Sequence, residues 1–256
     1  MRGLKKNRAR LGGLLAAAAI PATLVLAGNA EAQTAKASEL VFGCTDMPPR
    51  CYLNPQGQPD GISIRLGKAL LTKAGLQNRI VMYPASRLFA NLQSGTVHFA
   101  LLVPNPVLKE CCLMSRESVG RDELRVYRIG DKPSIKRKTD LAGKSVITVR
   151  GFSYGGLLEY INDPAQRVAN HVAGSHEAAF DMLVAGRADY VLDYAEAAGV
   201  TLAVNPVANL HYESLEQIQR YIYLHKTVPN AEKTMERLEA IVRTMNLDEF
   251  VRPAGK

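Results

Sequence analysis

A chain of 256 residues in which 47% are hydrophobic and 22% are charged is long enough to bury one large core or two smaller ones. The formal net charge is +8, but five basic residues and one acid lie before position 33, so the remainder carries 8 − 5 + 1 = +4. This mild charge and the absence of a dense basic run with interleaved aromatic residues argue against nucleic-acid binding.

Residues 1–32 have the pattern of a secretory signal peptide. Basic residues between positions 2 and 10 precede an uncharged run over 11–27, and Ala30-Glu31-Ala32 has the small-x-small form of a cleavage site. A transmembrane anchor is the alternative, but the run is marginal in length, rich in Ala and Gly, and contains Pro21. We therefore expect export to the periplasm and a mature chain that starts at Gln33.

Short apolar strands alternate with helical patterns in the first half of the mature chain. The predicted elements are a strand over 39–43, a helix over 61–74, a strand over 80–83, a helix over 88–92 and a strand over 99–103. The order β-α-β-α-β predicts a mostly parallel sheet covered by helices.

All the cysteines lie in this half, and their even number in an oxidising compartment predicts disulfides. Two arrangements stay open: Cys44 and Cys51 cross-paired with Cys111 and Cys112, or a Cys44–Cys51 loop with the other two free. Metal ligation is a further alternative, but Cys-x6-Cys followed by Cys-Cys, with no histidine at ligand spacing, is poor zinc geometry. We expect no metal and no cofactor.

The segment 141–158 predicts a strand, a tight turn and a helix. A β-branched run over 146–149 is broken by Gly151, and the apolar residues beyond have helical spacing. Ser153 can cap that helix, and the backbone N–H groups at its start favour negative charge beyond the end of the strand. Arg150 adds a positive charge, so the turn is a candidate oxyanion site.

The same turn matches G-x-S-x-G, the nucleophile elbow of serine hydrolases, with Ser153 as the nucleophile. The residues that follow it in the hydrolase order are Asp189 or Asp193, and then His211 or His225. However, no His-Gly-Gly type oxyanion loop precedes the serine, His225 lies beside a predicted strand, and His211 precedes a predicted polar helix. A secreted serine hydrolase therefore stays the alternative, and we expect a protein that is not an enzyme.

Three more elements complete the chain: strands over 124–129 and 221–224, and a helix over 232–245 whose apolar spacing indicates a core-facing side.

The order and spacing of these segments resemble the family 3 periplasmic solute-binding proteins, which include the polar amino-acid binders. The matching stretches are Asn-Pro-Gln-Gly-Gln-Pro-Asp-Gly from 54, Leu-Gln-Ser-Gly-Thr-Val-His-Phe-Ala from 92, Asp-Leu-Ala-Gly-Lys-Ser-Val-Ile-Thr-Val-Arg-Gly from 140, and Ala-Phe-Asp-Met-Leu-Val-Ala-Gly-Arg-Ala-Asp-Tyr-Val-Leu-Asp from 179. The resemblance implies an α/β fold of type II, in which two lobes, each a mostly parallel sheet flanked by helices, are joined by two crossover strands and close by hinge motion. Lobe 1 would cover 38–119 with a return over 222–256, and lobe 2 would cover 120–221.

The resemblance also implies where a ligand would bind. Met47 falls where the amino-acid binders place an aromatic residue, with Tyr52 or Phe152 as substitutes. Lys109 or Leu108 falls where they place a carboxylate-binding arginine, and a lysine lacks the bidentate fork of arginine.

Two further groups complete the expected site. The ammonium-binding aspartate is Asp193 by its place in the strand, or Tyr194 by ungapped alignment. The lobe 2 turn would bind through Gly151, Phe152 and Ser153. Three arginines could reach the cleft, and together with the turn they predict an anionic or carboxylate-bearing ligand: Arg50, Arg87 and Arg150.

These expectations together predict a monomeric periplasmic binding protein that captures a small polar or anionic, amino-acid-like solute and delivers it to an ABC importer in the membrane. A sensor or accessory protein of another periplasmic system would use the same kind of surface.

Overall fold

The computed structural model of the protein describes residues 39–251, so the predicted signal peptide lies outside the described residues. No helix within 39–251 is long and apolar enough to cross a bilayer.

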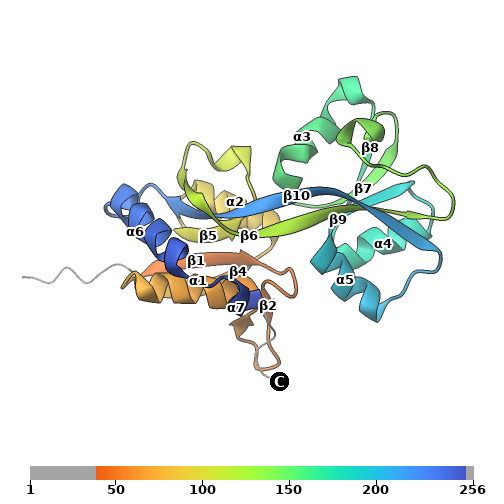
Figure 1. Ribbon diagram of the computed structural model, residues 1–256. Helices are drawn as coiled ribbons and strands as arrows, with labels where there is room; N and C mark the ends of the chain where they lie inside the picture. The colour runs from red at the N-terminus through yellow and green to blue at the C-terminus, as the bar shows by residue number, and fades with distance from the viewer. Residues whose placement is uncertain (1–38, 252–256) are drawn as a thin grey trace, which may run out of the picture. The chain divides into compact units, whose positions relative to one another are not determined.

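The first half of the described chain forms the predicted β-α-β-α-β unit (Figure 1). Its elements are β1 (Leu40–Thr45), a short hairpin of β2 (Tyr52–Leu53) and β3 (Pro59–Asp60), α1 (Ile62–Lys73), β4 (Asn78–Tyr83), α2 (Ala85–Gln93) and β5 (Phe99–Leu102). β1 lies between β4 and β5 and pairs with both in parallel. The carboxyl ends of these strands therefore meet at one edge of the sheet, where ligands bind in open α/β sheets.

A second unit of the same kind follows. Its elements are β7 (Ser145–Val149), α3 (Leu157–Asn162), β8 (Ala169–Ala173), α4 (His176–Val184), β9 (Tyr190–Tyr194) and α5 (Ala195–Val204). β7 lies between β8 and β9 and is parallel to both.

Two long strands join the lobes: β6 (Cys112–Ile129) and β10 (Leu210–His225), which are antiparallel to each other along most of their length. In Figure 1 both run from one lobe into the other. β10 pairs with β5 and β6 pairs with β9, so a single sheet has the order β4-β1-β5-β10-β6-β9-β7-β8. The chain then returns to the first lobe as α6 (Ala231–Thr244) and α7 (Asp248–Val251).

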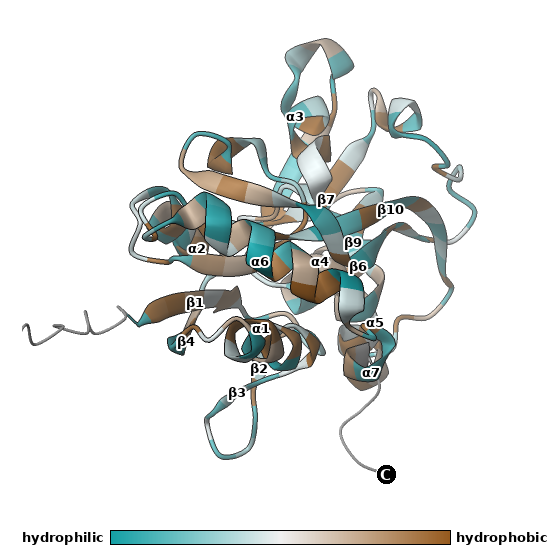
Figure 2. Cartoon of the chain, turned by 60° about the vertical axis from the view of Figure 1, so that its left-hand side comes forward, coloured by the Kyte–Doolittle hydropathy of each residue, from teal (hydrophilic) through white to brown (hydrophobic). Residues whose placement is uncertain are grey.

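Each lobe has its own hydrophobic core. In the first lobe, Phe42 and Phe99 meet edge to face with ring centroids 5.0 Å apart, and Leu70 of α1 and Leu238 of α6 close over them, all fully buried. Figure 2 shows β1 as a strongly hydrophobic strand beside α1. In the second lobe the core residues include Leu124, Ile147, Tyr154, Tyr190 and Val191. Burying a large apolar side chain contributes about 1.5–3 kcal/mol, so these clusters stabilise the lobes.

The crossover strands are longer than the sequence predicts, and the polar helix expected after His211 is wrong, because those residues belong to β10. In β10, Glu216 and Gln217 are polar and exposed and Glu213 is partly exposed, so this part of the strand lacks the apolar signal of a buried strand.

Of the two disulfide arrangements left open, the structure contains the Cys44–Cys51 loop, and Cys111 and Cys112 are free thiols. Within 39–251 no three His, Cys, Asp or Glu side chains gather in the way that a metal ion requires.

Candidate ligand-binding site

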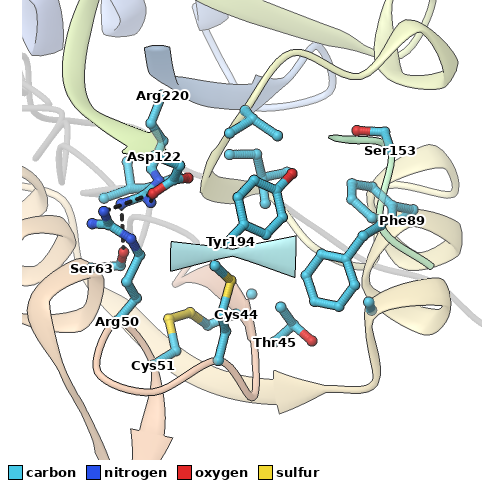
Figure 3. A pocket seen from close by; sticks show the side chains of 17 residues that line it. Cys44, Thr45, Arg50, Cys51, Ser63, Phe89, Asp122, Ser153, Tyr194 and Arg220 are labelled. Carbon is cyan, nitrogen blue, oxygen red and sulfur yellow. Dashed lines mark hydrogen bonds and ion pairs between the residues drawn. A yellow bond between two sulfur atoms is a disulfide. The ribbon is translucent and has the colours of Figure 1, made fainter. Parts of the chain in front are cut away.

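A small pocket lies where the carboxyl ends of β1 and β5 meet the turn after β7 and the start of α5. It has a volume of about 60 Å³ and is lined by 17 residues from both lobes and both crossover strands. Figure 3 shows charged side chains at one end of this pocket and Phe89 and Ser153 at the other, with Tyr194 between them. A water molecule takes about 30 Å³ of liquid volume, whereas pockets for small organic ligands hold roughly 300–1,000 Å³. At this point the lobes therefore leave too little room for such a ligand, and we call this conformation closed.

The turn after β7 makes direct contact with the first lobe. Ser153 Oγ donates a hydrogen bond to the Pro104 carbonyl oxygen at 3.3 Å. Gly151 has a φ of +87°, and a Cβ at this position would lie 2.7 Å from the backbone nitrogen of Ser86 and 2.8 Å from Ala85 Cβ. Only glycine permits both the backbone conformation and this close approach of the two lobes.

The expected helix cap by Ser153 is wrong. A 3-10 turn over Tyr154–Gly156 precedes α3, and the Ser153 side chain makes no capping hydrogen bond. The Tyr154 hydroxyl instead accepts a hydrogen bond from the Val149 N–H at 2.6 Å, which folds the turn back on its own strand. Within 39–251 the Gly151 and Ser153 N–H groups have no hydrogen-bond partner, so the turn keeps donors that a ligand can use.

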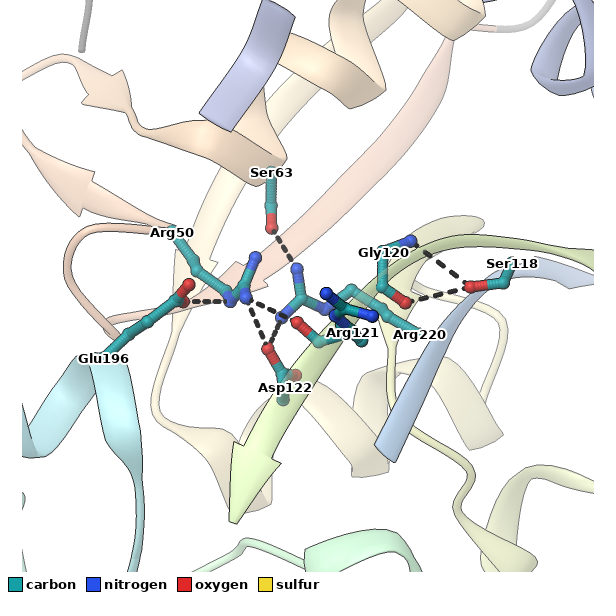
Figure 4. A network of polar contacts seen from close by, with 8 residues as sticks. All are labelled: Arg50, Ser63, Ser118, Gly120, Arg121, Asp122, Glu196 and Arg220. Carbon is teal, nitrogen blue, oxygen red and sulfur yellow. Dashed lines mark hydrogen bonds and ion pairs between the residues drawn. The ribbon is translucent and has the colours of Figure 1, made fainter. Parts of the chain in front are cut away.

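A buried network of charged groups lies at one end of the pocket (Figure 4). Asp122 of β6 accepts from Arg220 of β10 and pairs with Arg50 Nη2 at 2.7 Å. Arg50 also donates to the carbonyl oxygen of Arg121 at 2.9 Å, and Arg220 reaches Ser63 of α1 at 3.4 Å. The side chains of Arg50, Asp122 and Arg220 are each 9% exposed or less, so this network is largely removed from water.

Arg50 also connects the two lobes, because its Nε atom lies 2.6 Å from Glu196 Oε2 at the start of α5. The distance defines an ion pair, yet neither atom has a hydrogen-bond partner, so the N–H does not point at the oxygen. Burial raises the pKa of Glu196, and the positive charge of Arg50 only partly offsets that cost. The contact between the lobes at this point is therefore electrostatic and poorly directed.

The structure brings together five of the residues singled out from the sequence: Met47, Arg50, Phe152, Ser153 and Tyr194 all line the pocket. Gly151 lines a neighbouring pocket with Phe152 and Ser153, and Arg150 lines a third with His176. Arg87 and Lys109 are exposed and Tyr52 lies in the β2–β3 hairpin, so none of these three lines the central pocket.

Sequence reasoning missed four polar residues of the charged network: Ser63, Asp122, Glu196 and Arg220. A signal for two of them is present. Arg220 stands between Ile218 and Ile222 at the spacing of one strand face, and Asp122 precedes Leu124 in the same way. A charged residue at a core-facing position of a strand needs a partner, which marks such positions as candidate sites.

Asp193 is fully buried, and its carboxylate contacts His176 Nδ1 at 2.8 Å and accepts from the Tyr194 N–H at 2.8 Å. Of the two residues considered for the ammonium position, Tyr194 is therefore the one that lines the pocket.

The serine-hydrolase interpretation gains no support from Ser153, because its hydroxyl donates to a carbonyl oxygen. The candidate histidines contact other groups, His211 being next to Asn209 and His225 next to Thr227.

The His176–Asp193 pair should make stability depend on pH. Burial disfavours the charged imidazole, but the hydrogen bond and negative charge of Asp193 outweigh it, so the pKa of His176 is raised. A raised folded-state pKa adds stability that is fully present below the unfolded-state value of about 6.5 and is lost as pH rises through the folded-state value. Urea unfolding of the native protein and of His176→Asn should give free energies that differ most at pH 6 and converge as the pH rises.

The control for this series is His211→Asn, which changes an exposed histidine outside the pair. A difference between native protein and His176→Asn that grows with pH would contradict the assignment.

No protein-family model matches the chain, and no curated protein matches it. Solved structures do. A mutant of ArgBP from T. maritima is 21% identical with a TM-score of 0.66, covering 83% of this chain and 93% of that one. The substrate-binding protein of an amino acid ABC transporter is 18% identical with a TM-score of 0.63, covering 83% and 96%.

A histidine kinase sensor domain with similarity to periplasmic binding proteins is 18% identical with a TM-score of 0.68, covering 84% of this chain and 93% of that one. These similarities extend over nearly all of the described residues. The resemblance inferred from the sequence is thus confirmed for the fold: the chain has the two-lobed type II fold of the periplasmic binding proteins.

Proposed function

We propose that this protein is an exported binding protein that captures a small polar or anionic solute between its lobes and closes over it. The observation that carries the proposal is the pocket itself, in which polar groups of both lobes converge beside a wall of apolar side chains. Sites of this composition, at the carboxyl ends of parallel strands, are typical of small-molecule binding.

Closure by rotation of the lobes fits the boundaries expected near 119–120 and 221–222. Gly120 pairs with Arg220, and the register of β6 against β10 shifts on either side of Tyr221. Irregular pairing of this kind lets two strands bend, so we place the hinge here. Ligand contacts from both lobes would then stabilise the closed state, and a membrane partner would recognise that state.

We propose an ABC importer as this partner, on the analogy of the transporter substrate-binding protein among the similar structures. A sensor protein is the second candidate, because a histidine kinase sensor domain shares the fold at a comparable TM-score. An importer and a sensor protein would each recognise the binding protein in the periplasm, and each requires that it first binds its solute.

A thermal-shift screen of the chain from Gln33 onward tests the binding step. The panel contains amino acids, dicarboxylates and small monovalent anions at constant ionic strength. A ligand at about 100 times its Kd stabilises the folded state by about 2.7 kcal/mol, which should raise Tm by roughly 5–10 °C for a chain of this size. Failure of every solute to raise Tm, in protein whose unfolding is reversible, would contradict the proposal.

A further inference from the structure

Two hydrogen-bond donors in the central pocket have no partner among the described residues. Arg50 Nε and the Tyr194 hydroxyl are both buried, and both side chains line the pocket. Arg50 has 9% of its side chain exposed and Tyr194 is 2% exposed. Burying a donor without an acceptor is unfavourable, so the pocket offers a site for acceptor atoms.

The carboxylate that lines the pocket is already paired with arginine side chains. Among the 17 lining residues Asp122 is the only acid, and it is shared by Arg50 and Arg220. An ammonium group entering the pocket would find no free carboxylate there. An anion would find the Tyr194 hydroxyl and the Arg50 guanidinium, whose Nε makes no hydrogen bond.

Glu196 completes the charge balance, but it belongs to the second lobe. In the closed form, Arg50 and Arg220 face Asp122 and Glu196, so the charges sum to zero. If the lobes separate, Glu196 moves away from Arg50 with α5. Arg50 then loses one of its two carboxylate partners, and its guanidinium becomes available to an anion.

We propose that the ligand is a small carboxylate without an α-amino group, and that its anionic end replaces Glu196 on Arg50 and accepts a hydrogen bond from Tyr194. The proposal rests on the binding function proposed above and names its ligand class. Glu196 then competes with the ligand for Arg50. Its carboxylate pairs with Arg50 across the closed lobes without a hydrogen bond, whereas a ligand carboxylate would accept a hydrogen bond from Arg50 Nε.

Matched ligands test the class. Isothermal titration calorimetry on the mature protein uses straight-chain carboxylates from acetate to hexanoate, and for each one the α-amino acid and the amide of the same chain length. We expect at least one carboxylate to bind. The amino acid and the amide of the same chain length should bind at least about tenfold more weakly, because a hydrogen bond to a desolvated charged partner contributes more than 1.4 kcal/mol to binding.

Matched variants test the residues. Tyr194→Phe should weaken carboxylate binding by about tenfold, because it removes one hydrogen bond to a charged acceptor. Glu196→Gln should strengthen it by about two- to fivefold, in line with the loss of a partly exposed ion pair that competes with the ligand. The controls are Tyr160→Phe, a tyrosine outside the pocket, and Glu232→Gln, which like Glu196 is the second residue of its helix.

The outcomes separate this inference from the binding function. Tighter binding of α-amino acids than of their deaminated analogues, or weaker carboxylate binding by Glu196→Gln, would overturn the ligand class and leave the binding function in place. If no solute in this panel or the thermal-shift panel binds, both proposals fail.

Discussion

Replacement of Asp122 by Asn should lower the free energy of unfolding by about 3–5 kcal/mol, the usual cost of removing one partner from a buried ion pair. The carboxylate of Asp122 lies between two guanidinium groups whose side chains are 9% and 5% exposed. Asparagine keeps the shape of the side chain but removes its charge, so two buried cations would be left facing each other. Since domains are stable by only about 5–15 kcal/mol, this is a large fraction of the total.

Urea denaturation followed by circular dichroism gives the measurement, and Glu123→Gln is the matched control. Glu123 is the next residue of β6 and pairs with Arg125 at 2.8 Å, but its side chain is 25% exposed. An exposed pair contributes about 0–1 kcal/mol, so the control should change little. Equal effects of the two substitutions would mean that the network around Asp122 is not the buried ion cluster described above.

Replacement of Gly151 by Ala should keep the protein folded but prevent full closure. The added Cβ would overlap the backbone nitrogen of Ser86 and the Cβ of Ala85, both at the start of α2 in the other lobe. Because backbone atoms cannot move aside as a flexible side chain can, the lobes must separate. We expect the radius of gyration to increase in small-angle X-ray scattering. Affinity for any ligand held by both lobes should fall at least about tenfold, because more than 1.4 kcal/mol of binding free energy from contacts formed on closure is lost.

Gly143→Ala separates this effect from backbone strain. Gly143 has a similar positive φ of +69°, but nothing lies within 4 Å of the position of its Cβ. Both substitutions should therefore cost about 1–2 kcal/mol of stability through the left-handed backbone. Only Gly151→Ala should change closure and affinity. If Gly143→Ala reduced affinity as much, the approach of the turn to α2 would not be the cause.

The sequence predicts the β-α-β-α-β unit of the first lobe and the strand, turn and helix over 141–158 in the second. Their buried strands are short runs of β-branched or aliphatic residues, and their helices have an apolar face. The sequence does not predict the length of β6 and β10. Those strands carry charged residues on exposed faces and cross from one lobe to the other, so the pairing that stabilises them comes from residues far away in the chain.

The site is only partly predictable for a related reason. The turn at Gly151 is predictable because the glycine separates a strand pattern from a helix pattern within one short segment. In contrast, Arg50, Asp122, Glu196 and Arg220 come from a loop, two crossover strands and a helix start, and no local pattern links them. Likewise, cysteine spacing alone does not choose between a Cys44–Cys51 loop and cross-pairing, since that choice depends on which sulfur atoms the fold brings together.

The position of β10 in the sheet constrains how the molecule can assemble. This strand is inserted between β5 and β6, although it is the last strand in the sequence. Until it is in place, β5 and β6 each have an open edge, and α6 cannot cover the core around Phe42 and Phe99. Contacts between such distant parts of a chain form slowly, so we expect the first lobe to complete its folding only after the second lobe has been synthesised. A nascent chain that stops before Leu210 would expose two unpaired strands, which are templates for aggregation.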